Sequence, residues 1–216
     1  MSTKSTKSRP AKTTPARPAT GAPTAPAAKV GAGEIRIIGG QWKRTRLKVA
    51  TQPGLRPTPD RVRETLFNWL GQDLSGWRCL DAFAGTGALG FEAASRGAAS
   101  VQLVESDAAL VAQLHTLQQR LQATAMRVQR GDGVAALKQA APASLDLVLL
   151  DPPFDSDFFT PALQAAAQAV AADGFVYLEA PRAWNDEELA AWGLAVYRHL
   201  KAGAVHAHLL RRAVPL

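Results

Sequence analysis

The chain has 216 residues, which is long enough for one well-cored domain and an extension. Apolar residues make up 47% of it, yet no apolar run approaches the roughly 20 residues that span a bilayer, and the N-terminus lacks the apolar segment of a secretory signal. We therefore expect a soluble cytoplasmic protein without a membrane partner. The single cysteine, Cys79, excludes an internal disulfide and a zinc site built on cysteine pairs, and it is expected to be a buried apolar residue of a strand.

The net charge of +7 is concentrated in the N-terminal third of the chain. Residues 1–33 contain six basic side chains and no acid, and residues 34–78 contain nine basic and four acidic ones. The remainder is acidic overall, with ten basic and fourteen acidic side chains. This distribution predicts a polyanionic partner that the N-terminal third contacts.

Residues 1–33 are rich in Ser, Thr, Ala, Pro and Lys and show no hydrophobic periodicity. Such a segment buries too little apolar surface to offset the entropy lost on ordering, so we predict a disordered basic tail. Its prolines argue against the amphipathic helix of a mitochondrial transit peptide. Weak electrostatic help in RNA binding and a merely solvated tail are both compatible with its composition.

Residues 34–75 are predicted to form a basic hairpin followed by a helix. The stretch RIIGGQWKRTRLKV has two strand-like runs around a Gly-Gly pair, and its basic side chains are typical of a hairpin laid against phosphates. Trp42 either stacks on RNA or pins the hairpin. The expected RNA-binding residues of this segment are Arg36, Lys43, Arg44 and Arg46, with Lys48 in the same basic run.

The helix is expected to start at Thr58, a predicted cap, with Pro59 at the first helical position. Its buried stripe is predicted at Val62, Leu66 and Phe67, with Trp69 or Leu70. Three arginines are left to neutralise phosphates or to position the substrate: Arg56, Arg61 and Arg63. A solvated helix face explains Arg61 or Arg63 nearly as well.

From residue 76 onward, strand and helix signals alternate. The strand-like runs CLDAF, VQLVE, MRVQR, LDLVLL and FVYLEA are separated by helix-like segments at residues 88–96, 110–121, 134–140 and 161–172. LAVYRHL and KAGAVHAHLLRR then form a predicted antiparallel terminal hairpin. The alternation predicts an α/β fold with a seven-stranded, mostly parallel sheet and helices on both faces. Ligands of such sheets bind beyond the carboxyl ends of the strands, near the point where strand order reverses.

The first strand of this sheet ends in LDAFAGTGALG, whose glycines Gly85, Gly87 and Gly90 satisfy G-x-G-x-x-G between a strand and a helix. Such glycines let the loop turn tightly and let a ligand approach the backbone at the helix N-terminus. Glu105 ends the next strand, where a carboxylate can accept both ribose hydroxyl protons. Taken alone, the pattern is also that of a dinucleotide site.

Two further acids distinguish the ligand. Asp81 would crowd a pyrophosphate but suits the cationic amino-acid end of a ligand, and Asp132, in RGDG, can accept a hydrogen bond from an adenine amino group. With Glu105 they match S-adenosylmethionine. The expected cofactor-binding residues are Asp81, Ala82, Gly85, Gly87, Glu105, Ser106, Asp132 and Gly133. For Asp107, and for Asp132 taken singly, a helix cap is the alternative.

The fourth strand ends in Asp151, Pro152, Pro153 and Phe154. The exocyclic amine of a base is a poor nucleophile because its lone pair is delocalised into the ring. The Asp151 carboxylate and a backbone carbonyl held by the proline pair can bind both amine protons, while Phe154 stacks on the base. We predict that these four residues catalyse a methyl transfer without a metal. The histidines share no metal-like spacing with acids and are expected in structural or surface roles: His115, His199, His206 and His208.

DPPF resembles the Asp/Asn-Pro-Pro-aromatic motif of amino-methyltransferases, and DAFAGTGALG is similar to their cofactor loop. The flanks IRIIGGQWKRTRL (residues 35–47) and GLRPTPDRVRETLFNWL (residues 54–70) closely resemble the bacterial 16S ribosomal RNA guanine-N2 methyltransferases of the RsmD type. The resemblance covers about residues 34–212. It implies a class I methyltransferase (Rossmann-like) fold, S-adenosylmethionine as methyl donor, and methylation of guanine 966 on an assembled or nearly assembled small (30S) subunit.

Three hypotheses about function remain open. The first is this ribosomal methyltransferase, acting as a monomer, with a tail at residues 1–33, an RNA-binding extension at 34–75 and a methyltransferase domain at 76–216. The second is an amino-methyltransferase for adenine N6, cytosine N4 or a protein glutamine, against which the basic hairpin and the absence of a separate recognition domain count. The third is a non-catalytic RNA-binding module, which predicts a broken motif, whereas both motifs are intact.

Overall fold

The main sheet of the computed structural model, which describes residues 1–2, 32–50 and 58–213, has seven strands. Their order is β5-β4-β3-β6-β7-β9-β8. Strands β3 to β7 pair in parallel, and β9 runs antiparallel to both of its neighbours. The predicted α/β fold, with a mostly parallel sheet and a terminal antiparallel hairpin, is confirmed.

The strands of this sheet are β3 (Arg78–Asp81), β4 (Ser100–Glu105), β5 (Met126–Arg130), β6 (Leu145–Leu150), β7 (Val170–Ala180), β8 (Leu194–Ala202) and β9 (Val205–Arg212). The helices between them are α2 (Ala88–Ser95), α3 (Ala108–Arg120), α4 (Gly133–Gln139), α5 (Phe159–Ala169) and α6 (Asp186–Ala190). The helix predicted at residues 161–172 begins and ends earlier, because Val170 already pairs with Leu145 in the sheet. Helix α6 was not predicted, and a capping box between Asn185 and Glu188 fixes its start.

Each face of the sheet carries its own apolar core. Helices α2 and α3 contribute to one core, together with the N-terminal segment, and α4, α5 and α6 contribute to the other. Along β6, Leu147 and Leu149 belong to the first core while Val148 and Leu150 belong to the second. A strand covered on both faces needs apolar side chains in both directions, which explains the uninterrupted apolar run of β6.

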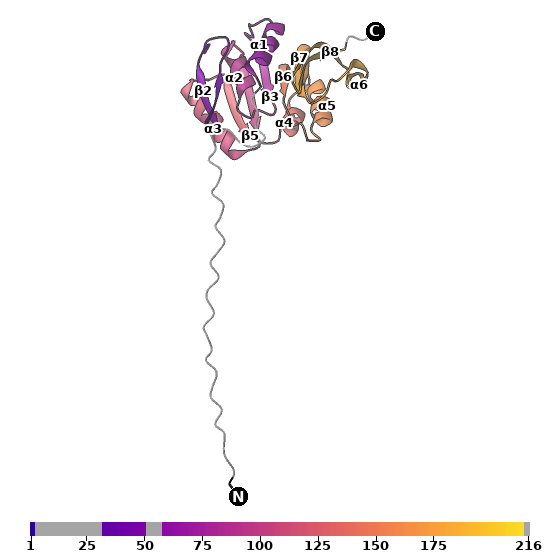
Figure 1. Cartoon of the computed structure of the whole chain (residues 1–216). Coiled ribbons are helices and arrows are strands. Elements are labelled where there is room, and N and C mark those ends of the chain that lie inside the picture. The colour runs from indigo at the N-terminus through magenta and orange to yellow at the C-terminus, as the bar shows by residue number, and fades with distance from the viewer. Residues whose placement is uncertain (3–31, 51–57, 214–216) are drawn as a thin grey trace.

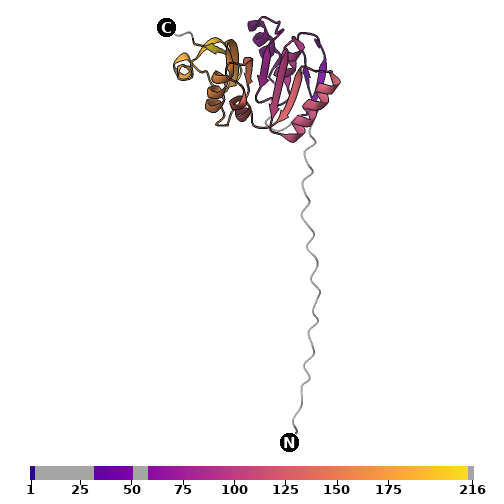
Figure 2. The ribbon, with the colours of Figure 1, turned by 180° about the vertical axis from the view of Figure 1, so that it is seen from behind.

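The N-terminal segment forms a small antiparallel sheet of β1 (Ala32–Arg36) and β2 (Arg46–Ala50), followed by helix α1 (Asp60–Trp69). The hairpin lies beside α3 in both views (Figures 1 and 2). Strand β1 begins two residues before the predicted tail boundary, and the rest of the predicted tail, residues 3–31, lies outside the described residues. Ile35 and Leu47 are buried in the same core as the sheet, so the hairpin packs directly against the main body.

Helix α1 confirms the predicted stripe but not the predicted start. Val62, Leu66 and Phe67 are buried, and Leu70 rather than Trp69 completes the set. The predicted cap is wrong: Pro59, with φ −57° and ψ 145°, occupies the N-cap and makes no side-chain cap bond. Thr58 lies one residue too far from the helix to cap it, and its side chain is buried beside the cavity described below.

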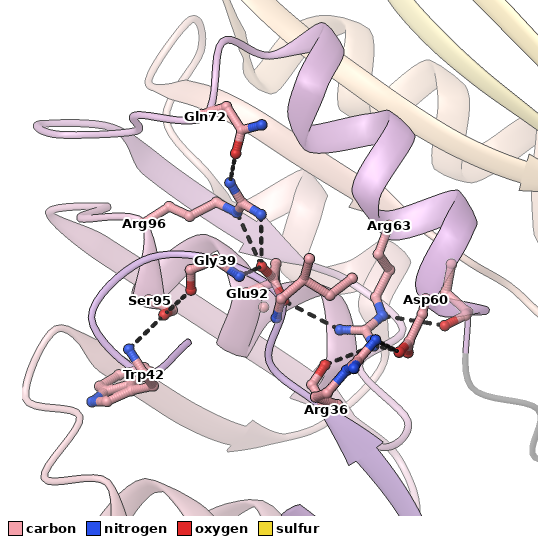
Figure 3. Close-up of polar contacts among 12 residues, drawn as sticks. Arg36, Gly39, Trp42, Asp60, Arg63, Gln72, Glu92, Ser95 and Arg96 are labelled. Carbon is pink, nitrogen blue, oxygen red and sulfur yellow. Dashed lines mark hydrogen bonds and ion pairs between the residues drawn. The ribbon is translucent and has the colours of Figure 1, made fainter. Parts of the chain in front are cut away.

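One buried carboxylate on α2 joins the N-terminal segment to the main body (Figure 3). Glu92 has no exposed surface and accepts backbone N–H bonds from Ile38 and Gly39, at 2.9 and 2.7 Å. It also accepts from the guanidinium groups of Arg63, at 3.2 Å, and Arg96, at 2.8 and 3.0 Å. Five donors from four residues thus converge on a single side chain, and three of those residues belong to the N-terminal segment.

The two arginines extend the network in opposite directions. Arg63 is fully buried and donates to the Thr58 carbonyl at 3.2 Å, to the Arg36 carbonyl at 2.9 Å and to the Asp60 carboxylate at 2.6 Å. Arg96 bonds Gln72 beyond the end of α1 and lies over the Phe67 ring, 4.6 Å from its centroid. Buried charges require such complete pairing, because an unpaired ion in the interior is costly.

The loop between β1 and β2 approaches α2 closely at Gly40. This residue has φ +72°, and a Cβ there would lie 1.8 Å from the Ser95 carbonyl oxygen. The next residue, Gln41, donates its backbone N–H to that same oxygen at 2.7 Å. Only glycine permits both the backbone conformation and the contact.

We predict that Glu92→Ala lowers the free energy of unfolding by about 3–5 kcal/mol, because it leaves two buried arginines without their shared anion. The matched control is Glu34→Ala, which removes an exposed ion pair with Arg46 and should cost about 1 kcal/mol or less. Urea denaturation of both variants measures the difference. Equal losses would show that the network does not secure the N-terminal segment.

Candidate functional site

A cavity of about 700 Å³ lies at the carboxyl ends of the parallel strands. Strand order reverses between β3 and β6, and both strands end at this cavity, as expected for a switch point. Its lining includes the acids Asp81, Glu105, Asp132, Asp151, Asp155 and Glu179. No basic side chain is among the described residues that line it. A site with this charge balance favours a cationic ligand.

Asp81, the last residue of β3, is almost fully buried at the floor of the cavity. Its Oδ2 accepts the Gly90 N–H at 3.1 Å, whereas its buried Oδ1 has no hydrogen-bond partner among the described residues. Burial raises the pKa of Asp81 to about 7; the Gly90 bond opposes this, and the charge of Glu105 adds to it. A buried carboxylate oxygen without a donor fits an ammonium group supplied by a ligand.

The glycine loop is held by Glu105, the last residue of β4. Its Oε2 accepts the Gly85 N–H at 2.8 Å, and its Oε1 accepts the Asp107 N–H at 2.8 Å. Gly87, with φ +79°, is the N-cap of α2. The Glu105 Oε1 also accepts the Ser106 hydroxyl at 3.3 Å. Since a carboxylate has about four acceptor positions, Glu105 retains one for a ligand hydroxyl, and a second becomes available when the rotatable Ser106 hydroxyl turns away. Ser106 follows Glu105 as an exposed residue of the cavity wall.

Asp132 and Gly133 follow β5. The Asp132 side chain caps α4 by accepting the Ala135 N–H at 2.7 Å, just as Asp107 caps α3, so the capping interpretation holds for both acids. Asp132 nevertheless also lines the cavity. A Cβ on Gly133 would lie 2.0 Å from the Ala82 carbonyl oxygen, so glycine is required where α4 begins against β3.

Asp151 is the first residue after β6. Burial raises its pKa well above the usual range for an aspartate, and the negative charges of Glu179 and Asp81 raise it further. The Thr58 side chain is hydrogen-bonded to the carboxyl group and opposes the shift. The N-terminal segment therefore completes the surroundings of Asp151. The sequence did not indicate this contact, because a threonine just before a helix is normally interpreted as its cap.

The two prolines after Asp151 differ in exposure. Pro152 is buried and Pro153 is exposed, and the Pro153 carbonyl accepts two bonds from Ser156, one from the N–H at 3.1 Å and one from the hydroxyl at 2.6 Å. Phe154 and Phe158 are both partly exposed and line the cavity, and the Phe158 ring is tilted by 37° against Phe83 with ring centroids 5.8 Å apart. The segment after β6 thus offers aromatic surface at the mouth of the cavity.

Glu179 is a cavity residue that the sequence analysis missed. It is buried on β7, and the pairing of Leu150 with Leu178 places it beside Asp151 on the neighbouring parallel strand. The Tyr177 hydroxyl donates to its Oε1 at 2.9 Å. Burial and the Glu179 charge raise the pKa of Tyr177 well above its usual range. FVYLEA carries the same signal as the other strands, an acid at the carboxyl end of an apolar run.

Comparison with known proteins assigns the chain to a family. The family described as "Conserved hypothetical protein 95" matches residues 35–211. This chain belongs to that family. The RsmD-type resemblance is thereby confirmed, since curated relatives with the name "Ribosomal RNA small subunit methyltransferase D" match the chain, among them the protein of Escherichia coli (strain K12), 50% identical over 124 residues.

The extent of these matches differs among relatives. The alignment with the Escherichia coli protein spans 57% of this chain and 62% of that protein, less than two thirds of its length. A relative from Buchnera aphidicola (subsp. Baizongia pistaciae) with the same name is 34% identical over 70% of this chain and 78% of its own. The solved structure of Escherichia coli yhhF covers 85% of this chain and 100% of its own, with 34% identity and a TM-score of 0.71.

The predicted RNA-binding residues fall into three groups. Arg36, Lys43, Arg44, Arg46 and Arg61 are exposed, and Arg56 lies outside the described residues. Arg63 was wrongly placed in this set, because it is fully buried and its guanidinium bonds Glu92, Asp60 and two carbonyls. Trp42 is half-buried against the core and donates its backbone N–H to the Ser95 hydroxyl at 3.0 Å, which favours the pinning role.

Three of the four histidines lie together on the terminal hairpin. The rings of His199, His206 and His208 stack on the terminal hairpin, with His199 4.6 Å from His208 and 5.2 Å from His206 between centroids. No group of three metal-ligating side chains occurs in the part of the chain that the structure describes. Cys79 is buried as predicted, and burial raises the pKa of its thiol to about 12. No helix within the described ranges is long and apolar enough to cross a membrane.

We predict that Asp81→Asn stabilises the ligand-free protein at high pH. In the folded chain this carboxyl group keeps its proton up to about pH 7, whereas its ordinary pKa is 3.8, so wild-type stability falls as pH rises between these values. The stability difference between variant and wild type should therefore grow from about pH 4 to pH 7, by at most about 4 kcal/mol, and then level off.

Urea denaturation at several pH values measures this difference. Asp157→Asn, which changes an exposed aspartate, is measured alongside as the control. A pH-independent difference for Asp81→Asn would contradict the raised pKa.

Proposed function

We propose that this chain transfers a methyl group from S-adenosylmethionine to the exocyclic N2 amine of one guanine in 16S ribosomal RNA, at position 966, on the small ribosomal subunit. The observation that carries the proposal is the acid-lined cavity at the switch point, where the glycine loop and the Asp151-Pro152-Pro153-Phe154 exit meet. The names of the curated relatives support a ribosomal RNA substrate. The solved relative yhhF supports the same fold over its whole length.

The cofactor residues would act as follows. The buried Asp81 carboxylate, with its unpartnered Oδ1, would bind the ammonium group of S-adenosylmethionine. Glu105 would accept the ribose hydroxyls while it holds the glycine loop, and Asp132 with Gly133 would border the adenine. Ala82, Gly85, Gly87 and Ser106 would shape the backbone around the ligand. The bound cofactor would supply an electrophilic methyl group on a cationic sulfur.

The target amine would be held by two acceptors. One is the Asp151 carboxylate, oriented by Thr58. The other is a backbone carbonyl of the proline pair, and Pro152 is the better choice because both lone pairs of the Pro153 carbonyl already accept bonds from Ser156. Binding both amine protons favours a pyramidal nitrogen whose lone pair is available for attack. Phe154 would stack on the base at the cavity rim.

Asp151 acts in this scheme as an ionised acceptor. Burial and the charges of Glu179 and Asp81 raise its pKa, and the amine and Thr58 would stabilise the charged form. The turnover should therefore rise with pH as Asp151 ionises. A preorganised acceptor in a buried site stabilises developing positive charge on the amine more strongly than water would.

We predict that Asp151→Ala abolishes methyl transfer while cofactor binding is largely retained, and that Asp81→Ala weakens cofactor binding. The assay combines radiolabelled S-adenosylmethionine with small subunits from cells that lack the endogenous enzyme, followed by nucleoside analysis. Calorimetry with S-adenosylhomocysteine measures cofactor affinity separately. Labelled N2-methylguanosine at one site is the expected product.

The two variants serve as controls for each other. Equal loss of cofactor affinity in both would contradict the division between a cofactor acid and an amine acid. A cofactor-binding protein that leaves the subunits unlabelled would overturn the ribosomal substrate and retain the reaction class.

The exposed basic residues of the hairpin would contact phosphates. Arg36 and Arg46 form surface ion pairs with Asp60 and Glu34, at 3.1 and 3.0 Å, which contribute little stability and can exchange for phosphate contacts. Lys43 and Arg44 lie exposed in the connecting turn. Since the loop around Gly40 is hydrogen-bonded to α2, the charged groups of Lys43 and Arg44 extend from a backbone that is fixed to the main body.

We predict that the double change Lys43→Ala, Arg44→Ala weakens binding to small subunits and lowers the slope of log affinity against log salt by about 1.4 to 1.8, as two lost phosphate contacts require. Lys138→Ala, an exposed charge on α4, is the control and should leave the slope unchanged. Titrations at four salt concentrations measure both slopes. An unchanged slope in the double variant would remove the hairpin turn from the RNA interface.

A further inference from the structure

The buried Glu179 and the half-buried Asp151 form a pair of acids within the proposed amine site. Because Leu150, the last residue of β6, pairs with Leu178, the residues that follow them, Asp151 and Glu179, come next to each other, and parallel strands are spaced about 4.8 Å apart. Leu149 and Tyr177 precede them by two residues in the same core, so both acids continue that face of the sheet. Both also line the cavity. The site therefore has two neighbouring carboxyl groups where the proposed chemistry uses one.

The edge of a guanine offers a reason for two acids. The N2 amine stands next to the N1 position, which carries a hydrogen in guanine and so acts as a second donor. If Asp151 and a proline carbonyl bind the amine, the N1–H points to a neighbouring position that requires an acceptor. A carboxylate is the strongest side-chain acceptor for it. Adenine and 2-aminopurine carry an N1 acceptor instead, which a carboxylate would repel.

We propose that Glu179 is a specificity-determining residue that accepts the N1–H of the target guanine, while Asp151 accepts from its N2 amine. The inference rests on the proposed function, because it assigns a further contact within the same site. Glu179 is held for this task by the Tyr177 hydroxyl, which donates to its Oε1 at 2.9 Å. Tyr177 is accordingly a positioning residue that does not touch the base.

The test uses small subunits reconstituted with RNA in which the methylated guanine is retained or replaced by 2-aminopurine. This analogue keeps the C2 amine but lacks the N1–H. Wild-type protein should show a kcat/KM for guanine roughly ten- to hundred-fold above that for 2-aminopurine, as expected for one charge-assisted bond to a buried donor. Glu179→Gln should lower the guanine value by a similar factor, leave the 2-aminopurine value within about threefold, and thereby remove the discrimination.

Three controls separate specificity from folding. Affinity for S-adenosylhomocysteine should be unchanged in Glu179→Gln, because Glu179 is not assigned to the cofactor. Tyr177→Phe should give a smaller loss on guanine alone, since the carboxylate remains but loses its orienting donor. Glu187→Gln removes an exposed acid on α6 and should match wild type on both substrates.

The outcomes distinguish this inference from the function on which it rests. If wild-type protein labels neither the guanine subunits nor the 2-aminopurine subunits, the proposed function fails and the inference fails with it. If wild type labels guanine and 2-aminopurine equally, the site has no acceptor for the N1–H, and the inference alone is overturned. This outcome needs only wild-type protein, so it does not depend on whether a variant folds. If Glu179→Gln lowers both substrates equally, Glu179 has a structural role and the inference is again overturned.

Discussion

The buried charge of Glu92 is the constraint on which the rest of the structure depends. An anion without solvent must be surrounded by donors, and this one gathers the hairpin backbone, Arg63 and Arg96 around α2. Arg63 in turn donates to the Thr58 carbonyl at 3.2 Å, and the Thr58 side chain bonds Asp151. A continuous path of hydrogen bonds thus runs from the contact between hairpin and helix to the strand end at the centre of the cavity.

Glu92 differs from the cavity acids Asp81 and Asp151 in whether the protein itself supplies the positive charge that pairs with the acid. Glu92 is neutralised by two arginines within its own network, and all of that charge is satisfied inside the protein. Asp81 and Asp151 have raised pKa values because burial, and then the charges of neighbouring acids, disfavour ionisation, and no arginine or lysine lines their cavity among the described residues. The structure satisfies Glu92 in full and leaves the strand ends short of positive charge. A cationic ligand is the simplest group that supplies it.

The sequence predicts the sheet well because each of its signals is local. Leu147 to Leu150 must form a covered strand, and the glycine loop must precede a helix, whatever the remainder of the chain does. The same local rules misplaced Arg63 and Thr58. A lone arginine on a helix is usually solvated, and a threonine before a proline is usually a cap, so only the tertiary contacts with Glu92 and Asp151 overrule them. A signal did exist at α2, where Glu92, the one charged residue of the helix, forms an i,i+4 pair with Arg96 at its C-cap.

The position of Thr58 gives the N-terminal segment a role in the proposed chemistry as well as in attachment. The basic residues proposed to contact RNA phosphates and a residue that holds the Asp151 carboxyl group belong to one segment, fixed to α2 through the same buried anion. Because rigid elements transmit position better than loops do, a substrate bound to the hairpin would be placed at a fixed distance from Asp151. Recognition and chemistry would then be aligned by the folded state itself, without any rearrangement on binding. The basic segment is therefore better regarded as part of the proposed active site than as an appended RNA-binding module.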